Sequence, residues 1–184
     1  MVLPPRVHSG MVDFDSPDEE AYERVTNPER FQAVVDAARG MIGEVVKTYE
    51  VESTPGNQSV DFPDWIGPFV EVMRLRPSQG APLTFLFTEF PGVIVRVGDW
   101  CVEGLPACGC DACNESPPEI VERLSDLVDA AVEGRFEEEL TKRTLTYTVS
   151  GRSGSESTER RLVRGEWKRR GVPAVHRWPA WSKR

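Results

Sequence analysis

Apolar residues recur at helical spacing in a first stretch near the start of the chain. The residues that share one face of such a helix are Phe31, Val34, Val35, Ala38, Ile42, Val45 and Tyr49. Asn27 can cap the helix, and Pro28 suits its first position because that residue needs no backbone donor. The pattern predicts an amphipathic helix over residues 28–50.

A second helical stripe follows in the later half of the chain. It consists of Val121, Leu124, Leu127, Val128 and Ala131. Ser116 and Glu119 have the spacing of a capping box, and two prolines between them fit the first helical turn. Gly134 is a natural stop, so we expect a second helix between these signals.

Strand-like runs occupy the region between the two helices. Residues 69–76, 83–90 and 93–100 are rich in β-branched and aromatic residues, and short turns with proline and glycine join them. Connections this short require antiparallel neighbours, so the three runs predict a meander. Two further strands are expected around residues 136–149 and 159–163, separated by a loop rich in glycine and serine.

These elements predict an α+β fold in the order α-β-β-β-α-β-β. We expect a two-layer arrangement, with an antiparallel sheet of about five strands and two helices on one face. The length of 184 residues fits one domain. Residues 26–164 would form that domain, with an acidic arm before it (residues 1–25) and a basic tail containing tryptophan after it (residues 165–184).

Charge is distributed unevenly along the chain. The net charge is −8, which argues against nucleic acid as the main partner. The last 26 residues nevertheless contain nine Lys/Arg against two Asp/Glu, interleaved with Trp167, Trp178 and Trp181. This tail could bind nucleic acid by phosphate contacts and base stacking. The alternative, which we favour, is that its arginines balance the acidic body and its tryptophans pack on the sheet edge.

The cellular setting follows from what the sequence lacks. No apolar stretch is long enough to cross a membrane as a helix, and the first residues do not resemble a secretory signal. We therefore expect a cytoplasmic protein, in which cysteines stay reduced.

All four cysteines lie in one short segment, the cysteine loop of residues 101–113. They are Cys101, Cys108, Cys110 and Cys113. The spacing of Cys110 and Cys113 is that of a zinc knuckle, and Gly109 could adopt a positive φ that turns backbone N–H groups toward sulfur. Four thiolates would make a closed tetrahedral site, which holds structure and performs no chemistry.

Two other interpretations of the cysteines stay open. They could be reduced thiols that pack a loop, since a free cysteine behaves as a small hydrophobe. They could also form a redox pair, either Cys108 with Cys110 or Cys110 with Cys113.

Catalytic signatures are missing from the sequence. It has no phosphate-binding glycine loop, no nucleophile elbow and no dinucleotide fingerprint, and it contains only two histidines. The acidic runs 18–20 and 137–139 are most simply interpreted as solvated faces. The sequence therefore favours a non-enzymatic interaction or accessory protein, with a structural zinc knuckle, over an enzyme.

Two segments resemble a known family. Residues 21–31 and the motif Leu-Pro-Ala-Cys-Gly-Cys-Asp-Ala-Cys at 105–113 are similar to an uncharacterised family of actinobacterial proteins with a domain of unknown function. The family motif contains the three later cysteines and not Cys101, which leaves His8, His176 or water as alternative fourth ligands. The element order is also similar to that of secretion chaperones, which implies a protein partner and a homodimer.

Overall fold

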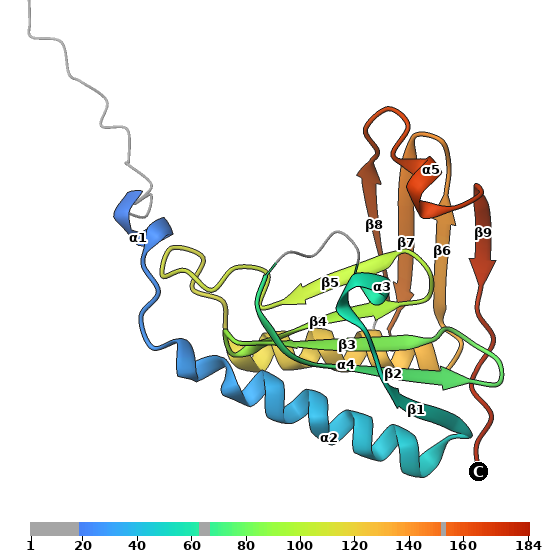
Figure 1. The fold of residues 1–184 in the computed structure, drawn as a ribbon, viewed down its shortest axis with the longest axis horizontal. Coiled ribbons are helices and arrows are strands. Elements are labelled where there is room, and N and C mark those ends of the chain that lie inside the picture. Colours follow the sequence, from blue (N-terminus) through green and yellow to red (C-terminus); the bar gives the residue numbers. More distant parts are fainter. Residues whose placement is uncertain (1–18, 63–66, 152–153) are drawn as a thin grey trace, which may run out of the picture.

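The fold consists of two antiparallel sheets and two long helices (Figure 1). The computed structural model describes residues 19–62, 67–151 and 154–184. Most of the expected acidic arm therefore lies outside the described residues, and of that arm the structure describes α1 (Glu19–Glu23) and the residues that follow it.

The first sheet contains the predicted meander. Its five strands lie in chain order and each pairs antiparallel with the next. They are β1 (Val51–Pro55), β2 (Phe69–Pro77), β3 (Leu83–Thr88), β4 (Gly92–Val97) and β5 (Cys101–Leu105). The turns before β3 and after β4 contain Gly80 and Gly98, whose φ angles of 98° and 65° favour glycine.

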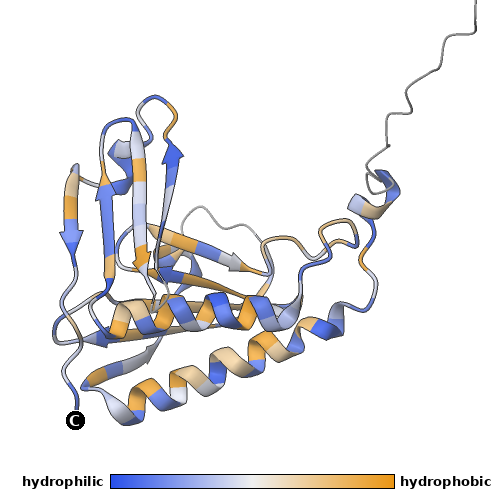
Figure 2. Cartoon of the chain, turned by 180° about the vertical axis from the view of Figure 1, so that it is seen from behind, coloured by the Kyte–Doolittle hydropathy of each residue, from blue (hydrophilic) through white to orange (hydrophobic). Residues whose placement is uncertain are grey.

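Two helices cover one face of this sheet. A 3₁₀ turn (Pro28–Phe31) leads into α2 (Gln32–Thr48), and α4 (Pro117–Val132) lies beside it. Figure 2 shows that apolar and polar residues alternate along both helices, as expected for amphipathic helices with one buried face. The buried residues of the helices and the inward residues of β3 and β4 form the main core, which includes Phe31, Phe85 and Leu124.

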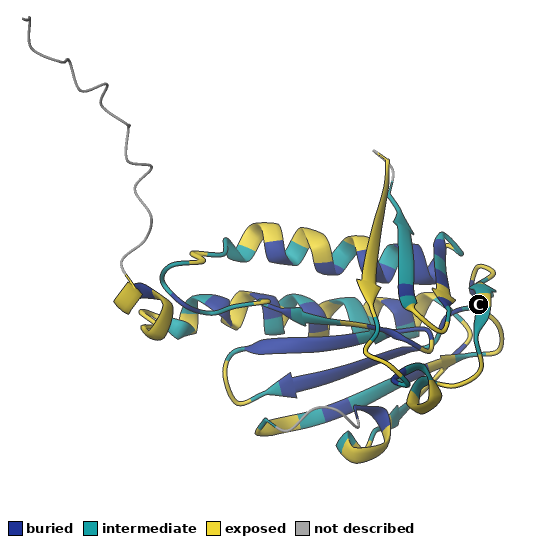
Figure 3. Ribbon diagram, turned by 90° about the horizontal axis from the view of Figure 1, so that it is seen from above, coloured by how far each residue is buried: buried dark blue, intermediate teal, exposed yellow. Residues whose placement is uncertain are grey.

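The second sheet stands at one end of the first (Figure 1). Its strands lie in the order β8-β7-β6-β9. Their bounds are β6 (Phe136–Leu140), β7 (Thr144–Ser150), β8 (Ser155–Arg161) and β9 (Ala174–Arg177), and the short helices α3 (Gln58–Asp61) and α5 (Trp167–Arg170) complete the structure. Every residue of β8 is exposed, which makes it the wet edge of this sheet (Figure 3).

The predicted α+β class, with a five-stranded antiparallel sheet and helices, is confirmed. The predicted element order needs correction, because the structure adds strands at four places, the last of which is β9 in the expected tail. Residues 51–55 form β1 between the predicted first helix and the first predicted strand, residues 101–105 form β5 inside the expected cysteine loop, and residues 136–150 form the hairpin β6–β7 where one strand was expected. The additional pairing produces a second sheet.

The C-terminal segment, residues 165–184, packs against the rest of the chain. Strand β9 pairs with β6, and Trp181 is buried with its indole N–H donating to the carbonyl of Ala81 at 3.0 Å. The backbone N–H of Glu50 donates to Ser182 O at 2.8 Å. These contacts agree with our favoured interpretation that the tryptophans pack against the sheet.

Among the helices of the described residues, none has the length and apolar character needed to cross a membrane.

Candidate metal centre

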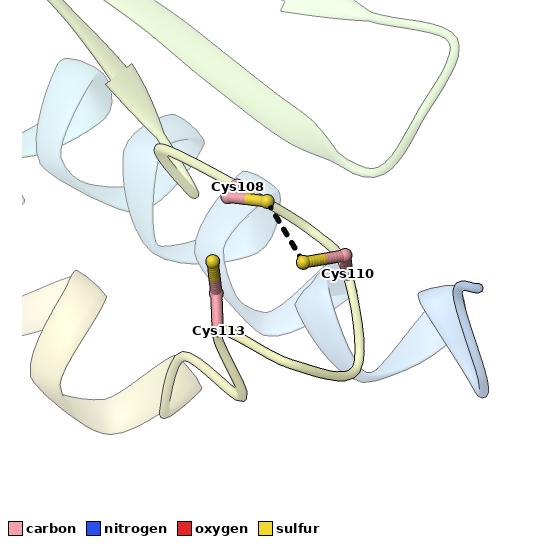
Figure 4. Close-up of side chains that lie close together, drawn as sticks. All are labelled: Cys108, Cys110 and Cys113. Carbon is pink, nitrogen blue, oxygen red and sulfur yellow. Dashed lines mark hydrogen bonds between the residues drawn. The ribbon is translucent and has the colours of Figure 1, made fainter. Parts of the chain in front are cut away.

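Three cysteine sulfur atoms converge in the loop between β5 and α4, residues 106–116 (Figure 4). The Sγ atoms of Cys108, Cys110 and Cys113 all lie within 4.8 Å of one another, and those of Cys108 and Cys110 are 3.1 Å apart. A tetrahedral zinc ion with Zn–S bonds of about 2.3 Å separates its sulfur ligands by about 3.8 Å. The three thiols are therefore close enough to one another to hold a metal ion.

Cys101 does not belong to this group. It begins β5, where it pairs with Val97, and its side chain is fully buried in the main core. Burial raises the pKa of its thiol well above the ordinary value. The group therefore contains three of the four cysteines that we expected to converge.

The alternative fourth ligands differ in where they lie. His8 lies outside the described residues. His176 is in β9 and belongs to a different group, with Asp99 and Glu138. Among the described residues, no histidine, cysteine or carboxylate joins the three cysteines as a fourth ligand.

The N-terminal segment, residues 21–31, is hydrogen-bonded to the cysteine loop. The backbone N–H groups of Asp111 and Ala112 donate to the carbonyls of Arg24 and Ala21 at 2.8 and 3.1 Å. The Asp111 carboxylate accepts from the backbone N–H and hydroxyl of Thr26, both at 2.7 Å, and from Arg24 Nε at 2.8 Å. The two segments that carry the family resemblance are therefore in direct contact (Figure 1).

These bonds also fix the charge of Asp111. Hydrogen bonds from Thr26 and Arg24 lower the pKa of its carboxyl group to about 2. Asp111 is thus an anion engaged with the N-terminal segment, and the cysteine group does not include it.

Position 109 needs a glycine because a neighbouring side chain leaves no room for a Cβ atom, and not because of its backbone conformation. Its φ is outside the positive range that we expected. A Cβ atom at this position would lie 2.4 Å from Cζ of Phe90, so the absence of a side chain allows the ring to contact the loop. Phe90 in turn packs on the buried Phe31, with ring centroids 5.7 Å apart.

Two local hydrogen bonds shape the rest of the loop. Asn114, with a φ of 43°, donates its backbone N–H to the carbonyl of Cys110 at 3.2 Å and turns the chain toward α4. The backbone N–H of Ala107 donates to Glu115 Oε2 at 2.9 Å. The second of these bonds joins the two ends of the loop.

The thiols influence one another's protonation. A hydrogen bond with Cys108 is the main cause that lowers the pKa of Cys110. Hydrogen bonds with Cys108 and Cys110 raise the pKa of Cys113 to about 12. The cluster therefore shares protons among closely spaced sulfur atoms, and a cation at its centre would replace them and favour the thiolates.

A second group of ligand-type side chains, which we did not predict, lies at the junction of the two sheets. Glu138 is buried, although we expected the run 137–139 to be solvated. Strand alternation explains the difference, because Glu137 and Glu139 point away from the face on which Glu138 lies. His176 Nδ1 lies 3.0 Å from Asp99 Oδ2 and 3.8 Å from Glu138 Oε1.

Glu138 is held by protein donors on both oxygens. Oε1 accepts from the backbone N–H of Asp99 and the indole N–H of Trp178, and Oε2 accepts from the backbone N–H groups of Trp100 and Cys101. Four donors satisfy this carboxylate without an ion, so we assign Glu138 a structural role. An alternating strand pattern around residues 136–140 is the sequence signal that could have indicated its burial.

The fold and the loop define an α+β protein with two antiparallel sheets and a three-cysteine cluster. The model of a family of unknown function, DUF6226, matches residues 8–184, and the chain belongs to this family. No curated protein and no solved structure matches the chain.

Proposed function

We propose that Cys108, Cys110 and Cys113 bind a zinc ion whose role is structural, in a non-enzymatic interaction or accessory protein. One observation carries the proposal: the three sulfur atoms lie within 4.8 Å of one another. Thiolates are preferred zinc ligands, and the free energy of binding would add to the stability of the loop.

The position of the site supports a structural role. The β5–α4 loop touches the N-terminal segment by backbone bonds to Arg24 and Ala21. An ion that fixes the loop would therefore also fix this segment against the domain. Zinc usually has four ligands. In this proposal water fills the fourth position in the isolated protein, and a donor atom of a protein partner replaces it in a complex.

Metal analysis of the full chain tests the proposal. Protein purified without a metal-affinity column is expected to contain about one equivalent of zinc. Cys110→Ser should lose the ion, whereas Cys101→Ser, a matched change of a cysteine outside the cluster, should keep it. Less than about a tenth of an equivalent in the unaltered protein, also after incubation with zinc, would reject the proposal.

A second function has support from a separate observation. The 3.1 Å separation of the Cys108 and Cys110 sulfur atoms suits disulfide formation in a thiol redox protein located in the cytoplasm. Peroxide would oxidise both thiols, forming one S–S bond and two water molecules with loss of two hydrogens from the protein. Mass spectrometry of the metal-free chain should detect this loss in the unaltered protein and in Cys113→Ser, but not in Cys108→Ser. An unchanged mass after mild oxidation would exclude the redox function.

A further inference from the structure

A cavity of about 320 Å³ lies between the two sheets. Its apolar wall consists of Phe62, Ile94, Trp100, Val102, Leu145 and Tyr147. Three arginines, Arg96, Arg160 and Arg170, also line it. An apolar enclosure with a few polar groups is the usual composition of a small-molecule site.

The register of both sheets builds this arrangement. On the face of the first sheet that is turned away from the helices, Arg96 in β4 lies directly opposite Val102 in β5. In the second sheet, Leu145 in β7 lies opposite Arg160 in β8. Each sheet thus contributes one cation beside one apolar residue to the same cavity. Strand pairing therefore places four of the residues that line the cavity.

Arg96 has a charge that the described residues do not neutralise by contact. Its Nε atom is buried without a hydrogen-bond partner, and the guanidinium group forms no ion pair with a described residue. Its carbon Cζ lies 5.5 Å from the centroid of the Phe62 ring. Burial, with a smaller contribution from Arg170, lowers the pKa of Arg96. A buried donor without a partner is costly unless a ligand satisfies it.

The acidic groups around the cavity are engaged elsewhere. The carboxylate of Asp61 accepts a hydrogen bond from Arg74 Nε at 2.7 Å. Asp99 and Glu138 attract Arg96 from a distance, but Asp99 contacts His176 and Glu138 accepts four hydrogen bonds from other groups.

On the opposite wall of the cavity, one carboxylate forms ion pairs with two arginines. Glu166 contacts both Arg160 and Arg170. The guanidinium groups of Arg96, Arg160 and Arg170 therefore border the same cavity.

We propose that the cavity binds a small organic anion, a carboxylate or phosphate carried on a flat apolar body. The guanidinium group of Arg96 would bind the anionic group, since arginine matches both oxyanions with paired donors. Trp100 and Phe62 would contact the apolar body, because aromatic rings offer large flat surfaces. The volume limits the body to about one or two rings.

The experiment is a nuclear magnetic resonance titration of the full chain with defined probes. Benzoate and phenyl phosphate test the two anionic groups, and benzamide and benzyl alcohol are neutral controls of similar shape. The reporter is the indole N–H of Trp100, which donates to Arg170 O at 2.8 Å beside the cavity. The indole N–H of Trp181, buried in the main core, is the reference that should not move.

Two variants separate binding from folding. Arg96→Met should weaken anion binding about ten-fold or more, because it removes a charged hydrogen-bonding group. It should not lower stability, because it removes a buried cation without a partner. Arg76→Met, a change of an exposed arginine in β2, should leave affinity unchanged. Val102→Phe fills the cavity from a residue that is 42% exposed, and should abolish binding in a folded protein.

The outcomes decide the proposal. Preference for benzoate, phenyl phosphate or both over the neutral probes, lost in Arg96→Met and Val102→Phe, supports it and identifies the anionic group. Equal shifts with neutral probes, unaltered affinity of Arg96→Met, or no shift of Trp100 with either anion at millimolar concentration would overturn it. The zinc proposal is unaffected by any of these results.

Discussion

Glu138 Oε2 accepts a hydrogen bond from the backbone N–H of Trp100 at 2.9 Å, which joins the second sheet to the turn that leads into β5 of the first sheet. The side chain of Glu138 is fully buried, and Gly98 allows the close approach, since a Cβ there would lie 2.3 Å from Glu138 Oε1. One carboxylate thus fixes how the two sheets meet.

Glu138→Gln is expected to destabilise the protein by about 1–3 kcal/mol. An amide offers only one oxygen, so its NH₂ group would face either the pair of N–H donors on one side or the pair on the other. Urea unfolding measures the effect, and Glu139→Gln is the matched control because that neighbour is exposed. A control change within about 0.5 kcal/mol, with a clear loss for Glu138→Gln, is the expected result. Equal stability of the two variants would contradict the role of Glu138.

Burial of Glu138 also makes the stability of the protein depend on pH. Desolvation raises its pKa above the ordinary value of 4.5, although hydrogen bonds from Asp99 and Trp100 oppose the shift. The folded state therefore binds more protons than the unfolded state just above pH 4.5, and this contribution to stability is lost as the pH rises through the folded pKa. The stability advantage of the unaltered protein over Glu138→Gln should be larger near pH 4.5 than at pH 7. Parallel curves for the two proteins would contradict the raised pKa.

The helices and the meander could be predicted because their patterns are strong. Amphipathic spacing and caps specify α2 and α4, and long apolar runs specify β2 to β4. Strand β1 has the sequence Val-Glu-Ser-Thr-Pro, which is short and polar and is stabilised by pairing with β2. Strand β9 likewise depends on pairing with β6. Such strands are determined by tertiary contacts, which a local pattern does not contain.

The cysteine cluster was predictable only in part. Spacing within residues 108–113 brings three sulfur atoms together locally, and that expectation agrees with the structure. The position of Cys101 depends on the pairing of β5 with β4, which carries the residue into the core. The arginine cavity depends on the meeting of two sheets, so no sequence motif indicates it.

Gly109→Ala should destabilise the loop by steric conflict. The added methyl group would meet the Phe90 ring at 2.4 Å, and that ring, which is 36% exposed, packs on the buried Phe31. We expect a loss of about 1–3 kcal/mol in the free energy of unfolding, measured by urea denaturation. Gly104→Ala in β5 is the control, since its Cβ would lie no closer than 3.6 Å to any atom. Similar losses for both glycines would show that Phe90 does not restrict the loop.

Asp111→Asn should loosen the N-terminal segment. An amide cannot accept all the bonds that the carboxylate accepts from Thr26 and Arg24. Hydrogen exchange should show faster exchange of the backbone N–H of Ala112, which donates to Ala21 O. Asp126→Asn on the exposed surface of α4 should leave that rate unchanged.

The same contact predicts an acid dependence. The pKa of Asp111 falls from 3.8 to about 2 in the folded state, so its contribution is complete above pH 3.8 and is lost as the pH falls toward about 2. Faster exchange of Ala112 should therefore appear in this range in the unaltered protein, and Asp111→Asn should show no such step. A step of equal size in both proteins would assign the transition to another group.

Trp181→Ala should cause the largest loss of stability among the C-terminal tryptophans. The side chain is 4% exposed, packs in the main core edge-on to Tyr49, and donates to Ala81 O. Truncation leaves a cavity and an unsatisfied carbonyl, for which about 3–5 kcal/mol is expected in urea unfolding. Trp167→Ala, in the half-buried α5, should cost less.

This comparison also bears on nucleic-acid binding by the C-terminal segment. Base stacking requires an accessible ring, and Trp181 has none to offer while the domain is folded. If the role of Trp181 is packing, Trp181→Ala will lose stability without any change in its salt-dependent retention on heparin. The unaltered protein and the variant are compared below their unfolding temperatures. Reduced retention of folded Trp181→Ala, with unaltered stability, would instead support a nucleic-acid surface built around this residue.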